Sequence, residues 1–137
     1  MGSSDPESIP VSTSSHGDPL ETFDALYRAA CDDRDAAAVH ALWATDSDTV
    51  MWGSDEDERA HGPEEVKALL EAVVASPSDL GFDWEEREQH VEGDVCWINA
   101  RGTLYVNGEA TPYRVTAVLV RRDGVWRWHT HSGSEPN

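Results

Sequence analysis

The sequence predicts an α+β domain in which a curved antiparallel sheet wraps around three helices from the first half of the chain. Apolar residues recur at helical spacing over residues 18–76, and from Phe82 onward the pattern changes to the period of two that is typical of strands. The turn signals Asn107-Gly108 and Asp123-Gly124 then divide the second half into long hairpins. Helices followed by a strand meander indicate helices packed on one face of a sheet.

The first seventeen residues differ in composition from the rest of the chain. The stretch "MGSSDPESIPVSTSSHG" is rich in Ser, Pro and Gly and has no apolar period. It predicts a disordered leader over residues 1–17. The remaining residues, 18–137, are enough for one domain with a single core.

Each of the three helices has a recognisable start. Asp18 can cap the first helix, with Pro19 at its first position and Glu21 completing a capping box. The second helix is expected to begin near Asp35, and the third at Pro63, which acidic residues follow in the first turn. The first helix is expected to bury one face, formed by Leu20, Phe23, Leu26, Tyr27, Ala30 and Cys31.

The strands begin with a short one and continue with four long ones. "TVMWGSD", residues 49–55, predicts a short strand that leads into the acidic loop "SDEDERAHG". The four long strands follow from Phe82 and end with "VWRWHTHS", residues 125–132.

One long strand is apolar on both faces. Val115, Ala117 and Leu119 lie on one side of it, and Val118 and Val120 lie on the other. An antiparallel sheet with one face in water would alternate more sharply between apolar and polar residues. A second copy of the sheet is therefore expected to cover the outer face, which predicts a homodimer.

The last strand, "WRWHTHSG", carries two tryptophans and two histidines. Successive side chains of a strand point to opposite faces. Regular alternation therefore puts Trp126 and Trp128 on one face, against the core or a partner. It puts His129 and His131 on the other face, toward the interior of the fold.

Composition excludes several classes of partner. The formal net charge is −17, from 27 acidic and 10 basic residues, which argues against nucleic acid and against an anionic membrane surface. The two cysteines, Cys31 and Cys96, form no CxxC motif and no disulfide framework. No signal peptide and no membrane-spanning run is recognisable, so a cytoplasmic protein is expected.

The chain resembles the SnoaL-like branch of the nuclear transport factor 2-like superfamily. The matching stretches are "FDALYRAACDDRDAAAVHALWA", "GPEEV", "VEGDVCWINARGTLY", "VLVRRDGVWRW" and "HSGSEP". "RRDGVWRWHTHSG" is also similar to the end of the hub (association) domain of calmodulin-dependent kinase II. The resemblance implies a cystatin-like cone, as in ketosteroid isomerase, with a pocket at its wide end. This superfamily includes isomerases, dehydratases, cyclases, epoxide hydrolases and non-enzymes.

The resemblance to the hub also implies site residues. "CWINARGTLY" matches a hub strand whose arginine points into the pocket, which implies that Trp97, Asn99 and Arg101 face inward. His90 matches a hub histidine that lies before the preceding turn. The second pocket arginine of the hub falls on Ala117, so its clamp for a carboxylate is expected to be absent.

The catalytic candidates are two histidines and one aspartate. His129 and His131 are interpreted as general acid-base groups or as hydrogen-bond donors to a ligand. A structural role for the two at the sheet edge or a dimer seam is the alternative, and a shared metal is the least favoured reading. Asp55 follows the "MWGS" strand, but it lies among further acidic residues, as in a solvated loop.

The tryptophans divide into core and pocket candidates. Trp43 and Trp126 are expected in the core. Trp52, Trp84 and Trp97 alternate with polar residues, which favours the pocket. A cavity lined by tryptophan suits a flat apolar or aromatic ligand.

The function predicted is binding of a small apolar or aromatic molecule by a cofactor-free acid-base enzyme, an isomerase, dehydratase or cyclase, with no metal. The alternative is a non-catalytic ligand-binding module or a dimerisation and assembly module. The catalytic candidates are His131, His129 and Asp55. The ligand-binding candidates are Trp52, Trp84, His90, Trp97, Asn99, Arg101 and Tyr113.

Overall fold

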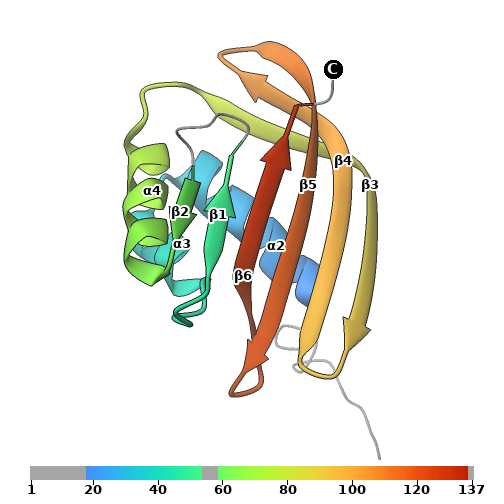
Figure 1. Ribbon diagram of the computed structural model, residues 1–137. Helices are drawn as coiled ribbons and strands as arrows, with labels where there is room; N and C mark the ends of the chain where they lie inside the picture. The colour runs from blue at the N-terminus through green and yellow to red at the C-terminus, as the bar shows by residue number, and fades with distance from the viewer. Residues whose placement is uncertain (1–17, 54–58, 136–137) are drawn as a thin grey trace, which may run out of the picture.

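The computed structural model describes residues 18–53 and 59–135 (Figure 1). The helices are α2 (Pro19–Tyr27), the π-helix η1 (Arg28–Asp33), α3 (Ala36–Ala41) and α4 (Pro63–Ala75). The strands are β1 (Val50–Trp52), β2 (Arg59–His61), β3 (Leu80–Glu92), β4 (Val95–Val106), β5 (Glu109–Arg122) and β6 (Val125–Ser134). The predicted leader and Asp55 lie outside the described residues.

The strands form one six-stranded sheet in the order β2-β1-β6-β5-β4-β3. The four long strands are antiparallel neighbours, as predicted. The sheet as a whole is mixed, because β1 pairs in parallel with β6. Figure 1 shows α2 lying across the sheet behind β6 and β5, with α3 and α4 beside the short strands β1 and β2. The α+β class is confirmed.

Side-chain caps fix the starts of the first two helices. The carboxylate of Asp18 accepts a hydrogen bond of 3.0 Å from the backbone N–H of Leu20. The carboxylate of Asp35 accepts one of 3.2 Å from the N–H of Ala38. The first helix does not continue as an α-helix to Cys31, since it widens into η1 after Tyr27. A π-helix is rare, and it often lies at a functional site.

Arg34 joins the end of η1 to the end of α4. Its guanidinium donates hydrogen bonds to the carbonyl oxygens of Val73, Val74 and Ser76 at 3.4, 3.2 and 3.0 Å. It also donates to the carbonyl oxygen of Ser78. These carbonyls lie in the last turn of α4 or follow it, where a helix leaves carbonyls without i+4 partners, and that of Val73 also accepts from the N–H of Ser76 at 3.2 Å.

Replacement of Arg34 with alanine is expected to lower the free energy of unfolding by about 1.5–3 kcal/mol, because hydrogen bonds from a charged donor are lost. Arg28→Ala is the matched control, since Arg28 is an exposed arginine at the start of η1, the element that Arg34 caps. It is expected to change stability by less than about 0.5 kcal/mol. Urea unfolding of both variants measures the difference, and equal losses would contradict this role of Arg34.

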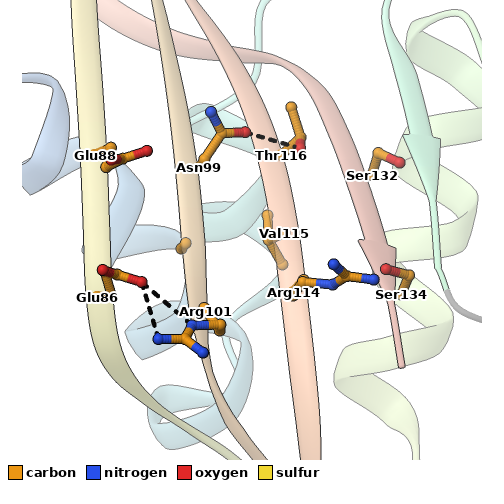
Figure 2. Close-up of a pocket in the computed structure, with 10 residues that line it drawn as sticks. Glu86, Glu88, Asn99, Arg101, Arg114, Val115, Thr116, Ser132 and Ser134 are labelled. Atoms are coloured by element: carbon orange, nitrogen blue, oxygen red, sulfur yellow. Dashed lines mark hydrogen bonds and ion pairs between the residues drawn. The ribbon is translucent and has the colours of Figure 1, made fainter. Parts of the chain in front are cut away.

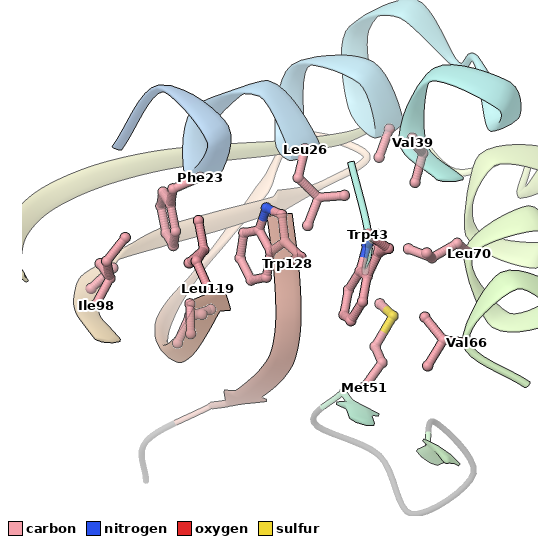
Figure 3. Close-up of a cluster of buried hydrophobic side chains, with 14 of the residues drawn as sticks. Phe23, Leu26, Val39, Trp43, Met51, Val66, Leu70, Ile98, Leu119 and Trp128 are labelled. Atoms are coloured by element: carbon pink, nitrogen blue, oxygen red, sulfur yellow. The ribbon is translucent and has the colours of Figure 1, made fainter. Parts of the chain in front are cut away.

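The core lies between the helices and the inner face of the sheet (Figure 3). Trp128 is fully buried at its centre. Its ring stacks on Phe23 with centroids 5.4 Å apart and on Trp43 with centroids 5.8 Å apart. Its indole N–H donates to the carbonyl oxygen of Thr22 at 3.1 Å. Trp43 and Trp126 are buried, as predicted.

A β-bulge in β6 changes which histidine faces inward. Val118 of β5 pairs with Thr130, but the next residue, Leu119, pairs with Trp128, so His129 is an extra residue. His131 consequently lies on the same inner face as Trp128, with ring centroids 5.5 Å apart. The prediction that the two histidines share a face opposite the tryptophans is wrong, because it assumed regular alternation.

A second bulge, in β3, depends on a glycine of the neighbouring strand. The register shifts between Trp84 and Glu86, and Trp84 pairs with Gly102. A Cβ atom at Gly102 would overlap the carbonyl oxygen of Asp83 and lie 2.8 Å from the Cα of Trp84. Only glycine allows β3 to approach β4 this closely.

None of the helices within 18–53 and 59–135 is long and apolar enough to cross a membrane.

Candidate functional site

A cavity of about 240 Å³ lies between the helices and the inner face of the sheet. The ends of α2, η1 and α4 line one side, and β1 and the long strands line the other. Most of its lining is aliphatic or aromatic, as in ligand-binding pockets. Its polar side chains are those of Tyr27, Cys31, Tyr113, His131 and Glu135.

His131 is a buried titratable group of the cavity, and only 5% of it is exposed. Its Nδ1 lies 3.3 Å from the carbonyl oxygen of Trp52, and its Nε2 lies 3.1 Å from the hydroxyl of Tyr27. A carbonyl can only accept, so Nδ1 carries the proton and Nε2 accepts from the tyrosine O–H. Burial lowers the pKa of His131 to about 4. The imidazole is therefore neutral near pH 7.

Tyr27 completes this pair from the last turn of α2. Its ring packs against Phe82 at 4.7 Å, Trp84 at 5.3 Å and Trp128 at 5.9 Å between centroids. Burial, and then the neighbouring Tyr113, raises the pKa of the Tyr27 hydroxyl well above its usual value. Tyr27 was assigned in the sequence only to the apolar face of the first helix. The sequence feature that could have indicated a site role is that Tyr27 is the one hydroxyl-bearing residue on that face.

Two further cavity residues carry polar atoms. Burial raises the pKa of the Cys31 thiol to about 11, so the thiol stays protonated and is a poor nucleophile. Tyr113 lines the cavity, where a ligand-binding residue was predicted, and its ring packs against Phe82 with centroids 5.5 Å apart. A Cβ atom at Gly133 would overlap the Tyr113 hydroxyl, so the glycine makes room for this ring.

Three residues expected inside the pocket lie on the outer face of the sheet instead. Cys96, Ile98 and Ala100 are the buried residues of this part of β4, so the residues between them point outward. Trp97 is 37% exposed. The inward orientation implied for Trp97, Asn99 and Arg101 by the resemblance to the hub is therefore wrong.

These outward residues have partners on their own face. The Arg101 guanidinium pairs with Glu86 at 3.0 Å, and Asn99 accepts a hydrogen bond of 3.1 Å from Thr116 (Figure 2). They line an open hollow of about 330 Å³ on the outer face, on the opposite side of the sheet from the cavity. His90 is exposed too, and its ring stacks on Trp97 at 5.5 Å, so it is not a residue of the cavity.

Trp52 and Trp84, the other two tryptophans predicted for the pocket, are not among the residues that line the cavity. The ring of Trp52 is 41% exposed and lies 6.2 Å from that of His61, so only its carbonyl reaches the site through His131. Trp84 stacks on Phe82 at 5.5 Å and packs against Tyr27, which holds the tyrosine ring in place.

His129 belongs to a separate polar cluster. Its Nε2 lies 2.9 Å from a carboxylate oxygen of Asp48, and this hydrogen bond lowers the pKa of Asp48. Ligand atoms of Asp46, Asp48 and His129 lie within 4.8 Å of one another, so these residues could hold a metal ion. A cation there would compete with Arg122, which pairs with Asp46 at 2.6 Å. Because the bulge separates His129 from His131, the two histidines do not form a shared metal site.

The buried state of His131 predicts a loss of stability at acidic pH. Its pKa is about 6.5 in an unfolded chain and about 4 in the folded protein, so between these values only the unfolded state takes up the proton. The stabilisation present above pH 6.5 is lost as pH falls toward 4, by about 3 kcal/mol in total.

Urea unfolding at about pH 7 and about pH 4.5 checks this, with His131→Gln as the comparison. The wild type is expected to lose about 2–3 kcal/mol more than the variant between these pH values. The same pH dependence in both proteins would contradict a buried neutral His131.

Comparisons with known proteins agree with this architecture. A family model described as the SnoaL-like domain matches residues 20–137. No curated protein matches the chain.

Several solved structures share the fold. A Streptomyces avermitilis protein of the NTF2-like family, proposed by its name to be a dehydratase, is 18% identical over 85% of this chain and 91% of its own, with a TM-score of 0.76. A Thiobacillus denitrificans protein, proposed by its name to be a calcium/calmodulin-dependent protein kinase type II association domain, is 20% identical over 87% and 95%, with a TM-score of 0.72.

A third structure, from Parabacteroides distasonis, is proposed by its name to be a ketosteroid isomerase. It is 19% identical over 85% of this chain and 87% of its own, with a TM-score of 0.68. Identities this low establish a shared fold, and the chemistry must be argued from the residues of the site.

Proposed function

The chain belongs to the SnoaL-like domain family of the nuclear transport factor 2-like superfamily, and from this premise we propose that it is a cofactor-free acid-base enzyme. Its substrate is a small apolar or aromatic molecule held in the inner cavity, and its reaction is an isomerisation, dehydration or cyclisation. The hydrogen bond of 3.1 Å between Tyr27 and His131 inside this apolar cavity is the observation that carries the proposal.

The protonation states of this pair suit acid-base chemistry near neutral pH. Burial lowers the pKa of His131, so Nε2 stays unprotonated and can act as a base. Burial raises the pKa of Tyr27, so its hydroxyl stays protonated and can act as an acid. Two adjacent groups whose pKa values are pushed apart are the usual arrangement for an acid and a base. His131 is the base in this proposal, and Tyr27 is the acid.

Dehydration of a β-hydroxy ketone illustrates the proton transfers. Nε2 of His131 removes a proton from the carbon next to the carbonyl, and the electrons of that C–H bond form the new C=C bond. The C–O bond of the hydroxyl breaks, and the leaving oxygen takes the proton of Tyr27 and departs as water. The tyrosinate then recovers a proton from Nε2 of His131 along their hydrogen bond, which restores both resting states.

The names of two similar structures support this class of chemistry but do not identify a substrate. One is proposed to be a dehydratase and another a ketosteroid isomerase, and both reactions move a proton next to a carbonyl.

The test uses uncharged single-ring probes, beginning with 3-hydroxycyclohexanone. Its dehydration gives 2-cyclohexenone, which is followed by ultraviolet absorbance, and NMR in D₂O follows exchange of the protons next to the carbonyl. We expect both reactions to exceed the buffer rate with the wild type, both to fall with His131→Gln, and dehydration to fall with Tyr27→Phe. Rates that Tyr27→Phe and His131→Gln leave unchanged would refute the proposal.

An assembly role is the second candidate, and the outer face of the sheet favours it. Val95, Trp97 and Tyr105 are exposed large apolar or aromatic side chains on the outer face of β4. A second copy of the sheet would cover them. An association domain is also among the proposed identities of the similar structures.

We expect a dimer in solution through this outer face, with a buried area of about 1,200–2,000 Å². Sedimentation at micromolar concentration should give twice the 15.1 kDa of the chain. Trp97→Glu should give a monomer, because a charge would be buried in the interface. Lys67→Glu is the control, since Lys67 is exposed on α4. A wild-type monomer would contradict the dimer.

A further inference from the structure

The size of the cavity limits its ligand. Its volume of about 240 Å³ is below the range of about 300–1,000 Å³ that is usual for drug-sized ligands. A cavity of about 150 Å³ already holds benzene. One ring with small substituents therefore fills the space enclosed by α2, α4 and the long strands.

The charge of the lining excludes anionic ligands. Among its described lining residues the cavity has no lysine and no arginine, and Glu135 supplies a carboxylate. His131 is neutral near pH 7, so it offers no positive charge either. A buried carboxylate or phosphate without a cationic partner is strongly unfavourable. The outer-face arginine Arg101 lies on the other side of the sheet.

The hydrogen bonds of the pair determine which polar group the ligand should carry. In the resting site the Tyr27 O–H satisfies Nε2 of His131, while Nδ1 is held by the carbonyl of Trp52. A ligand that only accepts, such as a simple ketone, would take the tyrosine proton and leave Nε2 buried without a donor. A ligand hydroxyl can accept from Tyr27 and donate to Nε2, so every buried polar atom keeps a partner.

We propose that the ligand of this cavity is an uncharged single-ring molecule whose hydroxyl group bridges Tyr27 and His131. The inference rests on the proposed function, in which Tyr27 protonates this hydroxyl as it leaves as water, and its hydrogen bond to Nε2 breaks before Nε2 takes the proton from carbon. It names the class of ligand more narrowly than the apolar or aromatic molecule predicted from the sequence.

Calorimetric titration with three matched probes tests the inference on the wild-type protein. p-Cresol carries the hydroxyl, p-xylene replaces it with a methyl group, and p-toluate adds a negative charge. We expect p-cresol to bind about tenfold more tightly than p-xylene, the equivalent of about one good hydrogen bond. p-Toluate is expected not to bind. In a purely apolar cavity the preference would be reversed, because an unpaired hydroxyl is costly to bury.

Two variants locate the effect. The double variant Tyr27→Phe/His131→Phe removes both hydrogen-bonding partners and should reduce the affinity for p-cresol to that for p-xylene or below, whereas Tyr27→Phe alone leaves Nε2 to accept the p-cresol hydroxyl. Tyr105→Phe is the matched control, since it removes a hydroxyl from an exposed position on β4, and it should change neither affinity.

The outcomes separate this inference from the proposed function. Equal or reversed affinities for p-cresol and p-xylene, or binding of p-toluate, overturn the inference while turnover of the ketone probe still supports the enzyme. Absence of binding by all three probes overturns the inference as well, and without turnover of the ketone probe it counts against the proposed function too.

Discussion

Replacement of His131 with glutamine is expected to lower the rate of dehydration of 3-hydroxycyclohexanone by about 10²–10⁴-fold, the usual contribution of a positioned general base. Glutamine has a similar size and still offers a hydrogen bond to Tyr27, but it cannot take up a proton near neutral pH. The rate is followed by ultraviolet absorbance of the product at several pH values, with circular dichroism as the check on folding.

His90→Gln is the control for this variant, because His90 is exposed on the outer face and stacks on Trp97. It is expected to leave the rate unchanged. A folded His131→Gln protein with the rate of the wild type would show that His131 is not the base. A variant that melts earlier but whose folded fraction keeps full activity would assign His131 a structural role.

Replacement of Trp128 with alanine is expected to lower the free energy of unfolding by about 3–5 kcal/mol. The ring is fully buried and stacks on both Phe23 and Trp43, so its removal leaves a cavity that rigid neighbours cannot fill. It also removes the donor to the carbonyl of Thr22. Urea unfolding measures the loss.

Trp52→Ala is the matched control, because it truncates the same residue type at a site that is 41% exposed. Its expected loss is under about 1 kcal/mol. A similar loss in both variants would mean that the two rings contribute equally, which contradicts the division into a core tryptophan and an exposed one.

The fold could be predicted because its elements follow from local patterns. The capping residues Asp18 and Asp35 mark helix starts that the structure contains, and the two turn signals after β4 and β5 lie where the hairpins turn. The parallel pairing of β1 with β6 and the strand β2 were not predicted, since three-residue strands carry almost no periodic signal.

The site was harder to predict than the fold, and the bulge in β6 is the main reason. One extra residue at His129 reverses the facing of every later side chain, which is why His131 joins Trp128 on the inner face. Strict alternation in the sequence gives no sign of such an insertion. His131 lines the cavity, as predicted, but because of the bulge and not because of regular alternation. His129 does not line it.

Register also explains the residues that were placed on the wrong side. Residues 96 and 98 of β4 point to one face, and residues 97 and 99 point to the other. The apolar Cys96 and Ile98 are buried against the helices, so Trp97 and Asn99 lie on the outer face. Tyr27 was missed for a different reason. An aromatic residue on the apolar face of a helix looks like ordinary core, and only the approach of His131 gives its hydroxyl a function.

The protonation of His131 is the measurement that tests the central claim most directly. ¹⁵N NMR of histidine-labelled protein, with His131→Gln for assignment, reports the tautomer and the titration of this ring. We expect a neutral imidazole with its proton on Nδ1 from pH 7 down to about pH 5, and a change at Nε2 when p-cresol is added. Titration near pH 6.5, or a proton on Nε2 in the neutral ring, would contradict an acid-base pair of Tyr27 and His131 in this cavity.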